Sequence, residues 1–386
     1  MKVAIYHPWI HLKGGGERIL LELLKKSRHD ITLFTSHYRQ ENTYEDFKKF
    51  KIIQLTRLPI IGELFRGLSF GLHLILCKLD LSPFDAFVVS SAGIGELITI
   101  RNHSKPALCI CLTPLRAAHD TAIYRHKLKE KNPISRQIYR LSIFFYKLLE
   151  KAAWKHFSSA ICISKNVRRR VLDGQLIGNK NITVSYPGAD FLKKGIDGEF
   201  RNYFLYPSRF AYYKRHELAI DAFKLFKARD SGNFKLILAG GLSGRNRKHF
   251  NFIESLAKGN DNIEIRTNVS DKEMKALYES CYCVLFCGMN EDWGMIPVEA
   301  GLYKKPVISV AEGGPLESII DGRTGFLVPA RPRPFAAAME KIARDVSLAK
   351  KMGGENFHNV KRFDWKKFVG DFDREVEKIA KRNKAA

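Results

Sequence analysis

Apolar positions along the chain follow two alternating periods. Short apolar runs rich in β-branched and aromatic residues predict buried strands; they lie at residues 3–6, 31–34, 86–90, 107–112, 159–163, 204–206, 236–239, 263–266, 282–286 and 306–310. Between these runs apolar residues recur every three or four positions, as in Ile19, Leu20, Leu23 and Leu24, which predicts helices. Strands that alternate with helices are typical of parallel sheets with right-handed crossovers.

The pattern breaks near the middle of the chain. Residues 185–190 are SYPGAD, and a charged stretch follows at residues 193–201, which is typical of a linker between domains. A chain of 386 residues is also too long for one ordinary domain and suits two. We therefore predict two Rossmann-like α/β domains with parallel sheets, at residues 1–190 and 191–362, and a C-terminal helix at residues 363–386.

The stretch at residues 290–310 combines polar groups with a predicted helix. Its loop carries Glu291 and Gly294, and Pro297 suits the first position of the helix that follows. That start puts Glu299 in the first helical turn. Because ligands bind beyond the carboxyl ends of parallel strands, both carboxylates are expected to face such a crevice. The carboxylate of the loop can accept hydrogen bonds from sugar hydroxyls, and the N–H groups at the helix start can meet a phosphate. The helix macrodipole alone also favours a glutamate in a first turn.

Two cations follow the predicted strand at residues 204–206. Arg209 and Lys214 lie between this strand and a helix predicted from about Glu217. An arginine can bind a diphosphate through two hydrogen bonds and a lysine as a point charge; ordinary surface charge is the alternative. Glycines at residues 14–16 occupy a similar turn, where the backbone can approach a phosphate closely. A simple tight turn is the alternative explanation for them.

The spacing of these motifs resembles a known family. Glu291, seven residues and Glu299, with Trp-Gly inside and Pro-x-Glu-Ala at the end, is similar to the signature of the retaining nucleotide-sugar glycosyltransferases of family 4, which have the GT-B fold. Arg209 and Lys214, five residues apart, match the family as well, as does Gly-Gly-x-x-Glu at residues 313–317. The resemblance covers most of the chain and is sharpest at residues 206–328.

The resemblance implies a fold and a set of roles. Two Rossmann-like domains would face a central cleft, with the acceptor in the first, the donor in the second and the last helix crossing back onto the first. The catalytic residues would be Arg209, Lys214 and Glu291. The donor would be bound by Gly15, Gly16, Arg209, Lys214, Val269, Glu291, Gly294, Met295, Ile296 and Glu299.

Within this set the resemblance gives each group a task. Arg209 and Lys214 would hold the diphosphate, Glu299 the ribose hydroxyls, and Glu291 with the amides of residues 294–296 the hexose, while Val269 would lie under the base. Transfer would retain the anomeric configuration by front-face attack, with the leaving phosphate taking the acceptor proton. Neither a metal nor another cofactor is expected, because the cations and the helix start take the place of a metal.

The chain departs from this family at one loop. The mannosyl-type members resemble Tyr-x-His-x-Pro-x-Arg there, whereas this chain has Leu112 in place of the histidine, followed by Pro114 and Arg116. We expect Arg116 on the acceptor side of the site. His119 lies a short way on and is the candidate replacement for the missing histidine, with an ordinary surface histidine as the alternative.

The formal net charge of +25 means that the surface attracts anions. A nucleic acid, an anionic membrane leaflet and phosphorylated small molecules all fit this charge. No recognisable nucleic-acid motif accompanies it, so no nucleic acid is expected as a partner. In residues 135–157 apolar residues recur at helical spacing with basic residues off that face, and we hypothesise that this helix and residues 58–79 dock on an anionic membrane. A solvated face on an ordinary packed helix is the alternative.

Cysteine usage and the N-terminus bear on the compartment. Seven cysteines, an odd number, are spread through apolar runs, which favours a reduced intracellular compartment. Cys281 and Cys287 on an extended strand would lie about 20 Å apart, too far to share a metal ion. The chain starts directly with a strand and shows no signal sequence. We expect a cytoplasmic protein, with a peripheral position on the cytoplasmic membrane face as a hypothesis.

The resemblance to family 4 implies a metal-independent hexosyltransferase. The residues of its motifs, including Tyr213-Lys214-Arg215, are most similar to those of enzymes that use GDP-mannose. The expected reaction therefore moves mannose from a nucleotide sugar to a glycan or lipid-linked acceptor. A UDP-sugar donor is the enzymatic alternative. A degenerate GT-B scaffold that binds anionic partners, suggested by Leu112 and the charge, is the non-catalytic alternative, and stabilisation by a nucleoside diphosphate separates it from an enzyme.

Overall fold

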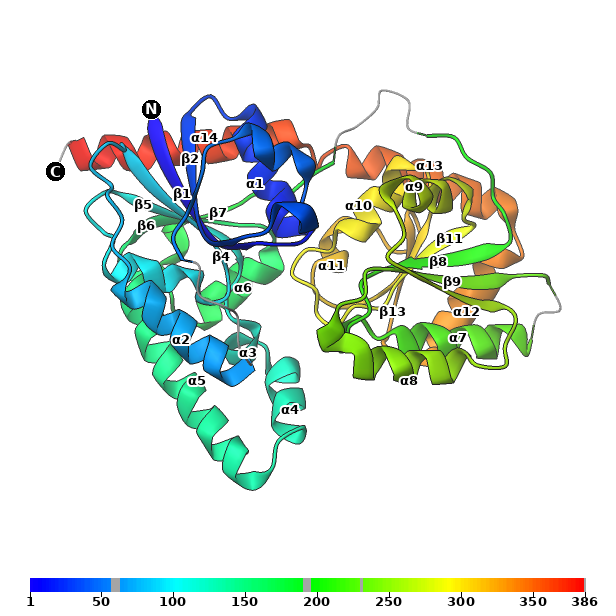
Figure 1. Ribbon diagram of the computed structural model, residues 1–386. Helices are drawn as coiled ribbons and strands as arrows, with labels where there is room; N and C mark the ends of the chain where they lie inside the picture. Colours follow the sequence, from blue (N-terminus) through cyan, green and yellow to red (C-terminus); the bar gives the residue numbers. More distant parts are fainter. Residues whose placement is uncertain (57–62, 190–195, 230–231, 385–386) are drawn as a thin grey trace. The chain divides into compact units, whose positions relative to one another are not determined.

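The computed structural model describes residues 1–56, 63–189, 196–229 and 232–384. The chain divides into two compact units, one made of Met1–Pro187 with Trp365–Ala386 and the other of Gly188–Asp364. Each unit is a parallel sheet covered by helices (Figure 1). Of the predicted linker, residues 190–195 lie outside the described part.

The first unit has a seven-stranded sheet in the order β3-β2-β1-β4-β5-β6-β7, in which every neighbouring pair is parallel. Its strands are β1 (Lys2–Ile10), β2 (Asp30–Tyr38), β3 (Ile52–Gln54), β4 (Ala86–Ala92), β5 (Ala107–Thr113), β6 (Phe157–Cys162) and β7 (Ile182–Val184). Its α-helices are α1 (Gly15–Lys26), α2 (Glu63–Leu76), α3 (Arg116–His119), α4 (Thr121–Lys129), α5 (Pro133–Trp154), α6 (Lys165–Asp173) and α14 (Trp365–Lys384). Short 3-10 helices are η1 (Gln40–Asn42), η2 (Glu45–Lys49), η3 (Ile94–Ile100) and η4 (Asn179–Asn181).

The second unit has a six-stranded parallel sheet in the order β10-β9-β8-β11-β12-β13. Its strands are β8 (Tyr203–Pro207), β9 (Lys235–Gly240), β10 (Ile263–Thr267), β11 (Cys283–Phe286), β12 (Val307–Val310) and β13 (Gly325–Val328). Its helices are η5 (Tyr212–Lys214), α7 (His216–Lys227), η6 (Gly244–Asn246), α8 (Arg247–Ala257), α9 (Asp271–Ser280), α10 (Met295–Leu302), α11 (Pro315–Ser318), α12 (Pro332–Ala343) and α13 (Val346–Val360).

Both sheets are buried on two faces, which explains why their strands are continuous apolar runs. The strands β5, β8, β11 and β12 are buried along their whole lengths, and strands covered by helices on both sides lose the polar alternation of a half-exposed sheet. The predicted parallel α/β architecture is confirmed. The strands β1 and β2 run further than predicted, to Ile10 and Tyr38, because their pairing continues to these residues.

Two predicted helices have different limits in the structure. The predicted helix at residues 135–157 is α5, which ends at Trp154 because Phe157 already begins β6. The helix predicted from Pro297 is α10, which begins at Met295. Glu299 is therefore the fifth helical residue, and the prediction that it lies in the first turn was wrong.

The C-terminal helix α14 belongs to the first unit (Figure 1). It packs against α1 and against β4, β5 and β6, and its buried Trp365 begins the contact. Three carboxylates on α14 accept hydrogen bonds from hydroxyls of the N-terminal half, at 2.6 Å for Ser185–Asp371, 2.6 Å for Ser27–Asp373 and 3.1 Å for Thr183–Glu375. The end of the chain thus completes the first unit.

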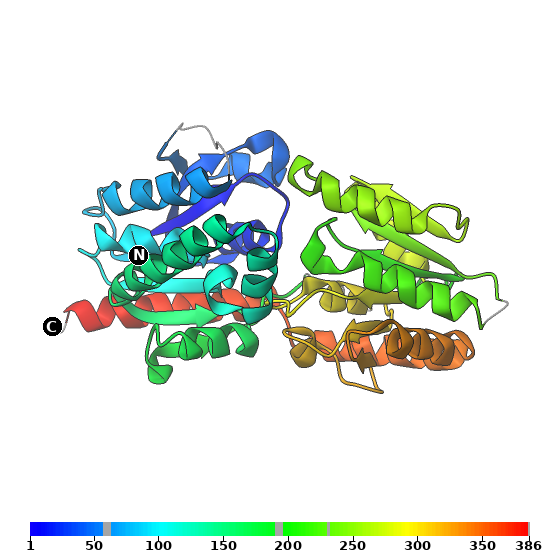
Figure 2. The ribbon, with the colours of Figure 1, turned by 90° about the horizontal axis from the view of Figure 1, so that it is seen from below.

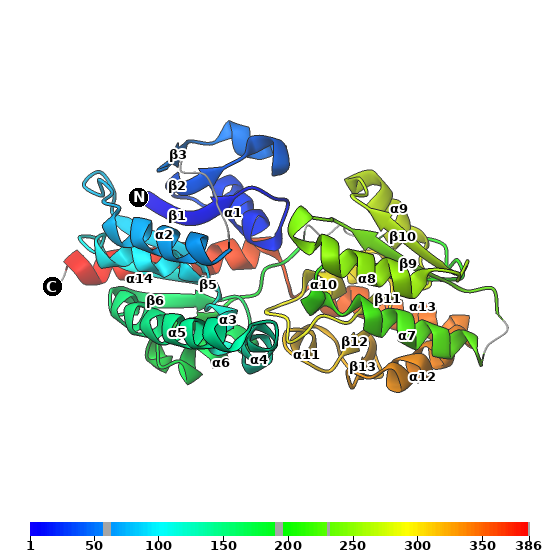
Figure 3. The same cartoon turned by 60° about the horizontal axis from the view of Figure 1, so that its bottom comes forward.

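The strand order of each sheet reverses at one point. The chain runs from β1 outward to β3 (Figure 3) and returns to β4 beside β1. In the second unit it runs from β8 to β10 and returns to β11 beside β8. At such a switch point the loops after two neighbouring strands diverge and leave a place for a ligand. The carboxyl ends of β1 with β4, and of β8 with β11, are therefore the candidate sites.

Candidate functional site

Three of the predicted donor residues lie at the switch point of the second unit, whereas Gly15 and Gly16 belong to the first unit. Arg209 and Lys214 lie in the loop after β8, and Glu291 lies in the loop after β11. The two loops are joined where the backbone N–H of Met289 donates to the carbonyl oxygen of Tyr213 at 2.8 Å. The structure therefore brings together two segments that are far apart in the sequence.

Lys214 and Glu291 form an ion pair. Lys214 Nζ donates to Glu291 Oε1 at 2.8 Å, and the two side chains are 12% and 14% exposed. The ammonium also lies 5.6 Å from the ring centroid of Phe286 and 5.7 Å from that of Tyr213, where an aromatic face attracts a cation. An ammonium has three donor hydrogens. The contact with Glu291 uses one of them, so Lys214 can hold this carboxylate and donate to a bound anion as well.

Arg209 lies closer to solvent than Lys214. Its Nη2 is 3.5 Å from the hydroxyl of Tyr213, and the residue is exposed. Its Cγ lies beside Gly241, where an added Cβ would be 3.7 Å away. A guanidinium that is supported along its stem and accessible at its head is suited to two parallel hydrogen bonds with a phosphate.

The start of α10 provides backbone amides at the end of the β11 loop. Gly294 is the N-cap residue, with φ of 80° and no side-chain cap. Glycine adopts this conformation without strain, and a Cβ there would come within 3.1 Å of the ring of Phe286. Met295 and Ile296 follow as half-buried residues of the first turn. First-turn N–H groups without a side-chain cap are suited to an anion.

Glu299 is oriented by a neighbouring helix. Its Oε2 accepts a hydrogen bond from the hydroxyl of Tyr278 in α9 at 2.8 Å. Tyr278 is buried and stacks on Tyr303, with ring centroids 5.2 Å apart. Burial first, and then the charge of Glu299, raise the pKa of Tyr278, so this hydroxyl remains a donor. Sequence analysis missed Tyr278 because its distance from Glu299 along the chain gives no hint of the contact.

Val269 lies at the same end of the sheet, after β10. The preceding Asn268 has φ of 54°, and Ser270 forms a capping box with Glu273 at the start of α9. These local features leave Val269 half-buried against the core of the second unit. Its predicted role under a base stays a prediction.

In the first unit the predicted glycine loop is the first turn of α1. Gly15 is the first helical residue, and a Cβ added to it would meet no atom within 4 Å. A Cβ on Gly16 would lie 3.0 Å from Leu112 Cδ1 and 3.7 Å from His7 Cε1. Leu112, which replaces the family histidine, therefore packs against this turn, and the packing explains the glycine at position 16.

His7 is a buried histidine beside this turn that the sequence analysis did not single out. Its Nδ1 lies 3.1 Å from the hydroxyl and 3.2 Å from the carbonyl oxygen of Ser90 in β4. Burial lowers the pKa of His7 to about 4, so the imidazole is neutral near pH 7. It lies beside Gly16, close to Leu112. A histidine on the strand that leads into a glycine turn is the sequence signal that indicates this position.

The two predicted acceptor-side residues both have carboxylate partners. Arg116 Nη2 donates to Asp120 Oδ2 at 2.8 Å. His119 Nε2 lies 2.6 Å from Glu150 Oε2, and the two side chains are 8% and 0% exposed. His119 is thus a half-buried residue whose imidazole is largely withdrawn from solvent and paired with a carboxylate, so the alternative of an ordinary surface histidine does not describe it. Its role as the replacement for the family histidine stays a prediction.

A second buried carboxylate stands behind this pair. The hydroxyl of Tyr146 lies 3.0 Å from Glu150 Oε1 and 2.5 Å from Glu96 Oε1. Burial first, and the charge of Glu150 second, raise the pKa of Glu96 to about 8. The Tyr146 hydroxyl is within donor distance of both carboxylates. If both were ionised, one tyrosine proton would have to serve two acceptors, so a proton held by Glu96 fits this arrangement. Glu96 stands within the otherwise apolar residues 94–100, and this position was the sequence signal that could have indicated a buried carboxylate.

Replacement of Glu96 with glutamine is expected to remove a pH dependence of stability. In the wild type, the unfolded chain loses the Glu96 proton near its ordinary pKa and the folded chain keeps it to about pH 8. Stability therefore falls as pH rises between these values, by at most about 1.4 kcal/mol per pH unit. Denaturant unfolding at pH 5.5 to 8 should show that the advantage of wild type over Glu96→Gln shrinks as pH rises. A constant difference would contradict the raised pKa; the exposed Glu45→Gln variant is the control.

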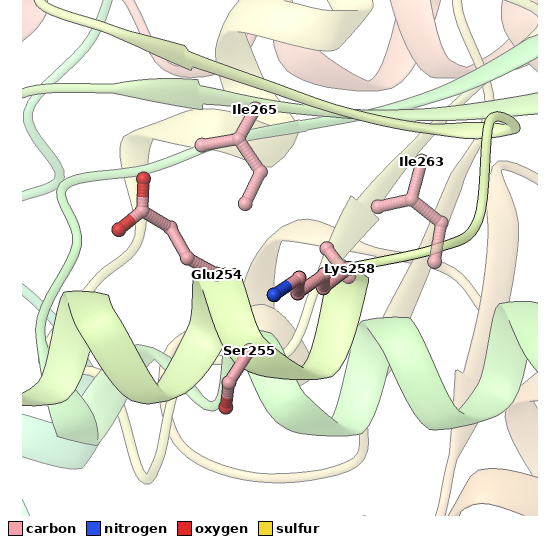
Figure 4. Close-up of a pocket in the computed structure, with 6 residues that line it drawn as sticks. Glu254, Ser255, Lys258, Ile263 and Ile265 are labelled. Atoms are coloured by element: carbon pink, nitrogen blue, oxygen red, sulfur yellow. The ribbon is translucent and has the colours of Figure 1, made fainter.

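A shallow pocket elsewhere in the second unit is separate from these residues. It lies between α8 and β10 and is lined by Glu254, Lys258, Ile263 and Ile265, among others (Figure 4). Its Ser255 hydroxyl already donates to the carbonyl oxygen of Phe252 at 2.7 Å. None of the predicted site residues lines it, and we assign it no role.

Cysteines and other metal ligands form no cluster in the described part of the chain. No group of three or more His, Cys, Asp or Glu side chains there is placed to hold a metal ion. All seven cysteines are free thiols. Cys281 lies outside β11, which begins at Cys283, so the extended run through Cys287 that the sequence suggested is shorter in the structure.

Comparison with known proteins identifies the class of this molecule. Residues 190–357 match the family described as glycosyl transferases group 1. Over 98% of its length the chain is 25% identical to an alpha-1,3/1,6-mannosyltransferase, ALG2, of Dictyostelium discoideum, of which it covers 98%. The protein is a glycosyltransferase.

A further relative agrees with this class, and a solved structure shows the fold. Over an alignment of 183 residues, which covers 45% of the glycosyltransferase and 44% of human ALG2, the two chains are 34% identical. The fold is similar to that of Anabaena HepE, solved in complex with UDP-glucose, with a TM-score of 0.72, 16% identity and full coverage of both chains. The predicted GT-B fold of the glycosyltransferase is confirmed.

Proposed function

We propose that this glycosyltransferase moves mannose from GDP-mannose to a glycan or lipid-linked acceptor, with retention of the anomeric configuration. The observation that carries the proposal is the ion pair of Lys214 with Glu291 at the switch point, beside the uncapped start of α10. The names of the ALG2 relatives support mannose as the sugar. The residues of the chain's motifs, which resemble those of enzymes that use GDP-mannose, support guanine as the base of the donor nucleotide.

In the proposed reaction the second unit stabilises the leaving group. Arg209 and Lys214, with the amides at the start of α10, place positive charge where the diphosphate gains negative charge. Glu291 holds the Lys214 ammonium and accepts hydrogen bonds from the hexose hydroxyls, while Glu299, fixed by Tyr278, binds the ribose. These groups provide the charge that a metal would otherwise supply, so the proposal includes no metal.

The bond changes balance without an added base. The bond between the anomeric carbon and the phosphate oxygen breaks, and the acceptor oxygen bonds to the anomeric carbon on the same face. The acceptor proton passes to the departing phosphate oxygen, which lies on that face. The task of the protein is therefore to orient donor and acceptor and to neutralise the diphosphate.

A nucleotide panel tests the proposal. Thermal unfolding and donor hydrolysis are measured with GDP-mannose, UDP-glucose, UDP-N-acetylglucosamine, GDP and UDP, for wild type and for Arg209→Ala and Glu299→Ala. Ligand binding to the folded state raises the unfolding temperature, so GDP and GDP-mannose should stabilise the wild type and lose this effect in both variants. Stabilisation by the uridine nucleotides alone would assign a UDP-sugar donor. No response to any nucleotide would leave the scaffold alternative.

We further propose that an anionic membrane surface is a partner of the first unit. The helix α5 exposes a band of large apolar side chains, between 39% and 76% accessible: Ile134, Ile138, Leu141, Phe144, Phe145, Leu148 and Leu149. Its inner face packs through Tyr146, Glu150, Ala153 and Trp154 instead. The sequence-based alternative of a packed apolar face with an ordinary solvated side does not describe this helix.

The charges of α5 indicate the sign of the surface. The only acidic residue of the helix, Glu150, is buried, and the exposed charges are basic, namely Arg136, Arg140, Lys147 and Lys151. Helix α2, with exposed Leu72 and Leu76, packs against the same 3-10 helix η3 as α5 does, and both lie along the outside of the first unit (Figure 2). Apolar side chains bordered by cations suit an anionic bilayer interface. Residues 57–62 of the apolar stretch lie outside the described part.

Vesicle binding should be strong only when the apolar band of α5 is intact and the vesicle carries anionic lipid. We expect wild type to sediment with phosphatidylglycerol-containing vesicles at low salt and to remain in solution with pure phosphatidylcholine. The double variant Leu141→Ser and Phe145→Ser should lose at least about tenfold in partitioning, because each apolar side chain contributes about 1.5 to 3 kcal/mol when buried. Phe252→Ser, at a similarly exposed phenylalanine of α8, is the matched control. Equal loss in both variants would contradict the assignment to α5.

The peripheral position proposed here needs no spanning segment. Among the described helices, none combines the length and the apolar character that crossing a membrane requires. The proposed face is the cytoplasmic one, where anionic lipids attract basic segments.

A further inference from the structure

Two non-glycine residues beside the donor site have left-handed backbone conformations. Arg215 has φ of 52° and Asn290 has φ of 43°. Asparagine visits this region readily, but an arginine there is under strain. Arg215 directly follows Lys214, and Asn290 directly precedes Glu291. The two left-handed positions thus flank the two partners of the ion pair at the site.

A single carboxylate holds both of these residues. Arg215 Nη1 donates to Glu312 at 3.1 Å and 3.0 Å from its two oxygens, and the backbone N–H of Asn290 donates to Glu312 Oε2 at 3.1 Å. The side chains of Arg215 and Glu312 are 18% and 32% exposed, so the pair is partly withdrawn from water. Glu312 follows β12 and comes from neither of the two site loops.

The turn that carries Glu312 also packs closely against the β11 loop. Gly314 N–H donates to the carbonyl oxygen of Glu291 at 2.8 Å. Gly313 has φ of 64°, and an added Cβ would lie 2.4 Å from that same oxygen. The backbone of Glu291 is therefore fixed by residues 312–314 from one side and its side chain by Lys214 from the other.

We propose that Glu312 is a positioning residue for donor activation. Its carboxylate holds the loops after β8 and β11 in their left-handed conformations at Arg215 and Asn290, so that Lys214 and Glu291 meet at the distance observed. Glu312 acts through Arg215 and Asn290 and does not touch the sugar or the diphosphate. The proposal rests on the donor site proposed above and adds the group that assembles it.

Kinetics of donor hydrolysis test this role on the full chain. With GDP-mannose as the probe, Glu312→Ala should lower kcat by about tenfold to a hundredfold, because a shift of about 1 Å in a reacting group can cost this much. The affinity for GDP should change far less, because Arg209 and the start of α10 remain. Glu312→Gln should recover part of kcat, since its amide oxygen still accepts from the N–H of Asn290. Glu340→Ala removes the carboxylate of another Arg–Glu pair in the same unit, Arg229–Glu340, and should leave kcat unchanged.

A double-mutant cycle separates positioning from a general loss of stability. Glycine adopts the conformation of Arg215 without strain, so Glu312→Ala should cost less in kcat in an Arg215→Gly background than in the wild type. Such non-additivity marks a shared element. Equal costs in both backgrounds, or a wild-type kcat in Glu312→Ala, would overturn the proposal.

Failure of the donor site itself is recognised separately. If wild type binds none of the nucleotides, the proposed function falls. Hydrogen exchange still tests, without a ligand, whether Glu312 holds the two loops through Arg215 and Asn290. Amides of residues 212–216 and 288–292 should exchange faster in Glu312→Ala than in wild type or Glu340→Ala. Unchanged exchange in these segments would overturn the positioning role, whatever the reaction.

Discussion

Replacement of Lys214 with methionine is expected to lower transfer from GDP-mannose by about 100- to 1,000-fold. The ammonium is the most enclosed cation of the predicted donor set, paired with Glu291 at 2.8 Å and bordered by Phe286 and Tyr213. Methionine keeps much of the apolar stem but cannot neutralise the charge that develops on the diphosphate. Because this charge is greatest in the transition state, kcat should fall more than the affinity for the nucleotide.

The fold must be shown to survive this change. Removal of Lys214 leaves Glu291 partly buried without its cation, which can cost about 1 to 3 kcal/mol in stability. The double variant Lys214→Met and Glu291→Gln removes both charges, and it should recover stability without recovering activity. Lys224→Met, at an exposed lysine of the nearby α7, is the control for loss of a positive charge. A Lys214→Met enzyme with kcat within threefold of wild type, a span of about 0.7 kcal/mol, would refute the electrostatic role.

The largest effect on stability is expected at Gly353, in the middle of α13. A Cβ at Gly353 would lie 1.9 Å from the carbonyl oxygen of Lys304, whereas a Cβ at the neighbouring Gly354 would meet no atom within 4 Å. Gly353→Ala therefore forces α13 away from the end of α10, which should cost about 3 kcal/mol. The methyl group added by Gly354→Ala would meet no neighbouring atom, and alanine restricts the unfolded chain more than glycine does. This variant should therefore stabilise the folded protein by about 0.5 to 1 kcal/mol.

These adjacent glycines provide their own control. Both substitutions add one methyl group to the same helix, and they differ only in what lies opposite. Thermal unfolding should show a decrease of about 6 to 12 °C for Gly353→Ala and a small increase for Gly354→Ala. Changes of the same sign in the two variants would contradict the close approach of α13 to Lys304.

The displacement of α13 in Gly353→Ala should also affect the donor site. Asn356, one turn after Gly353, donates to the carbonyl oxygens of Lys305 and Pro297, at 2.9 Å and 3.4 Å. Pro297 lies in α10, whose first turn is part of the proposed anion site. A displaced α13 should therefore weaken GDP binding as well as stability.

The sequence by itself determined the sheets and the position of the donor motifs. Strands covered on both faces must be apolar along their length, so β8, β11 and β12 were visible as runs. Parallel strands align their carboxyl ends, which predicted that Glu291 faces a crevice there, and the family resemblance grouped Arg209 and Lys214 with it. The start of α10 was misplaced by two residues, because Pro297 satisfies the local rule for a first helical residue while Gly294 actually caps the helix.

Only the tertiary structure decided how these groups are held. Glu312 meets Arg215 across 97 residues, and Lys214 meets Glu291 across 77; His119 is paired with Glu150, and the apolar band of α5 is exposed. A repeating pattern reports whether a position is apolar, and it does not report which distant side chain faces it. Such pairings depend on the packing angles and loop paths of the whole unit. The sequence therefore specified the elements and the chemistry, and the packed fold selected the partners.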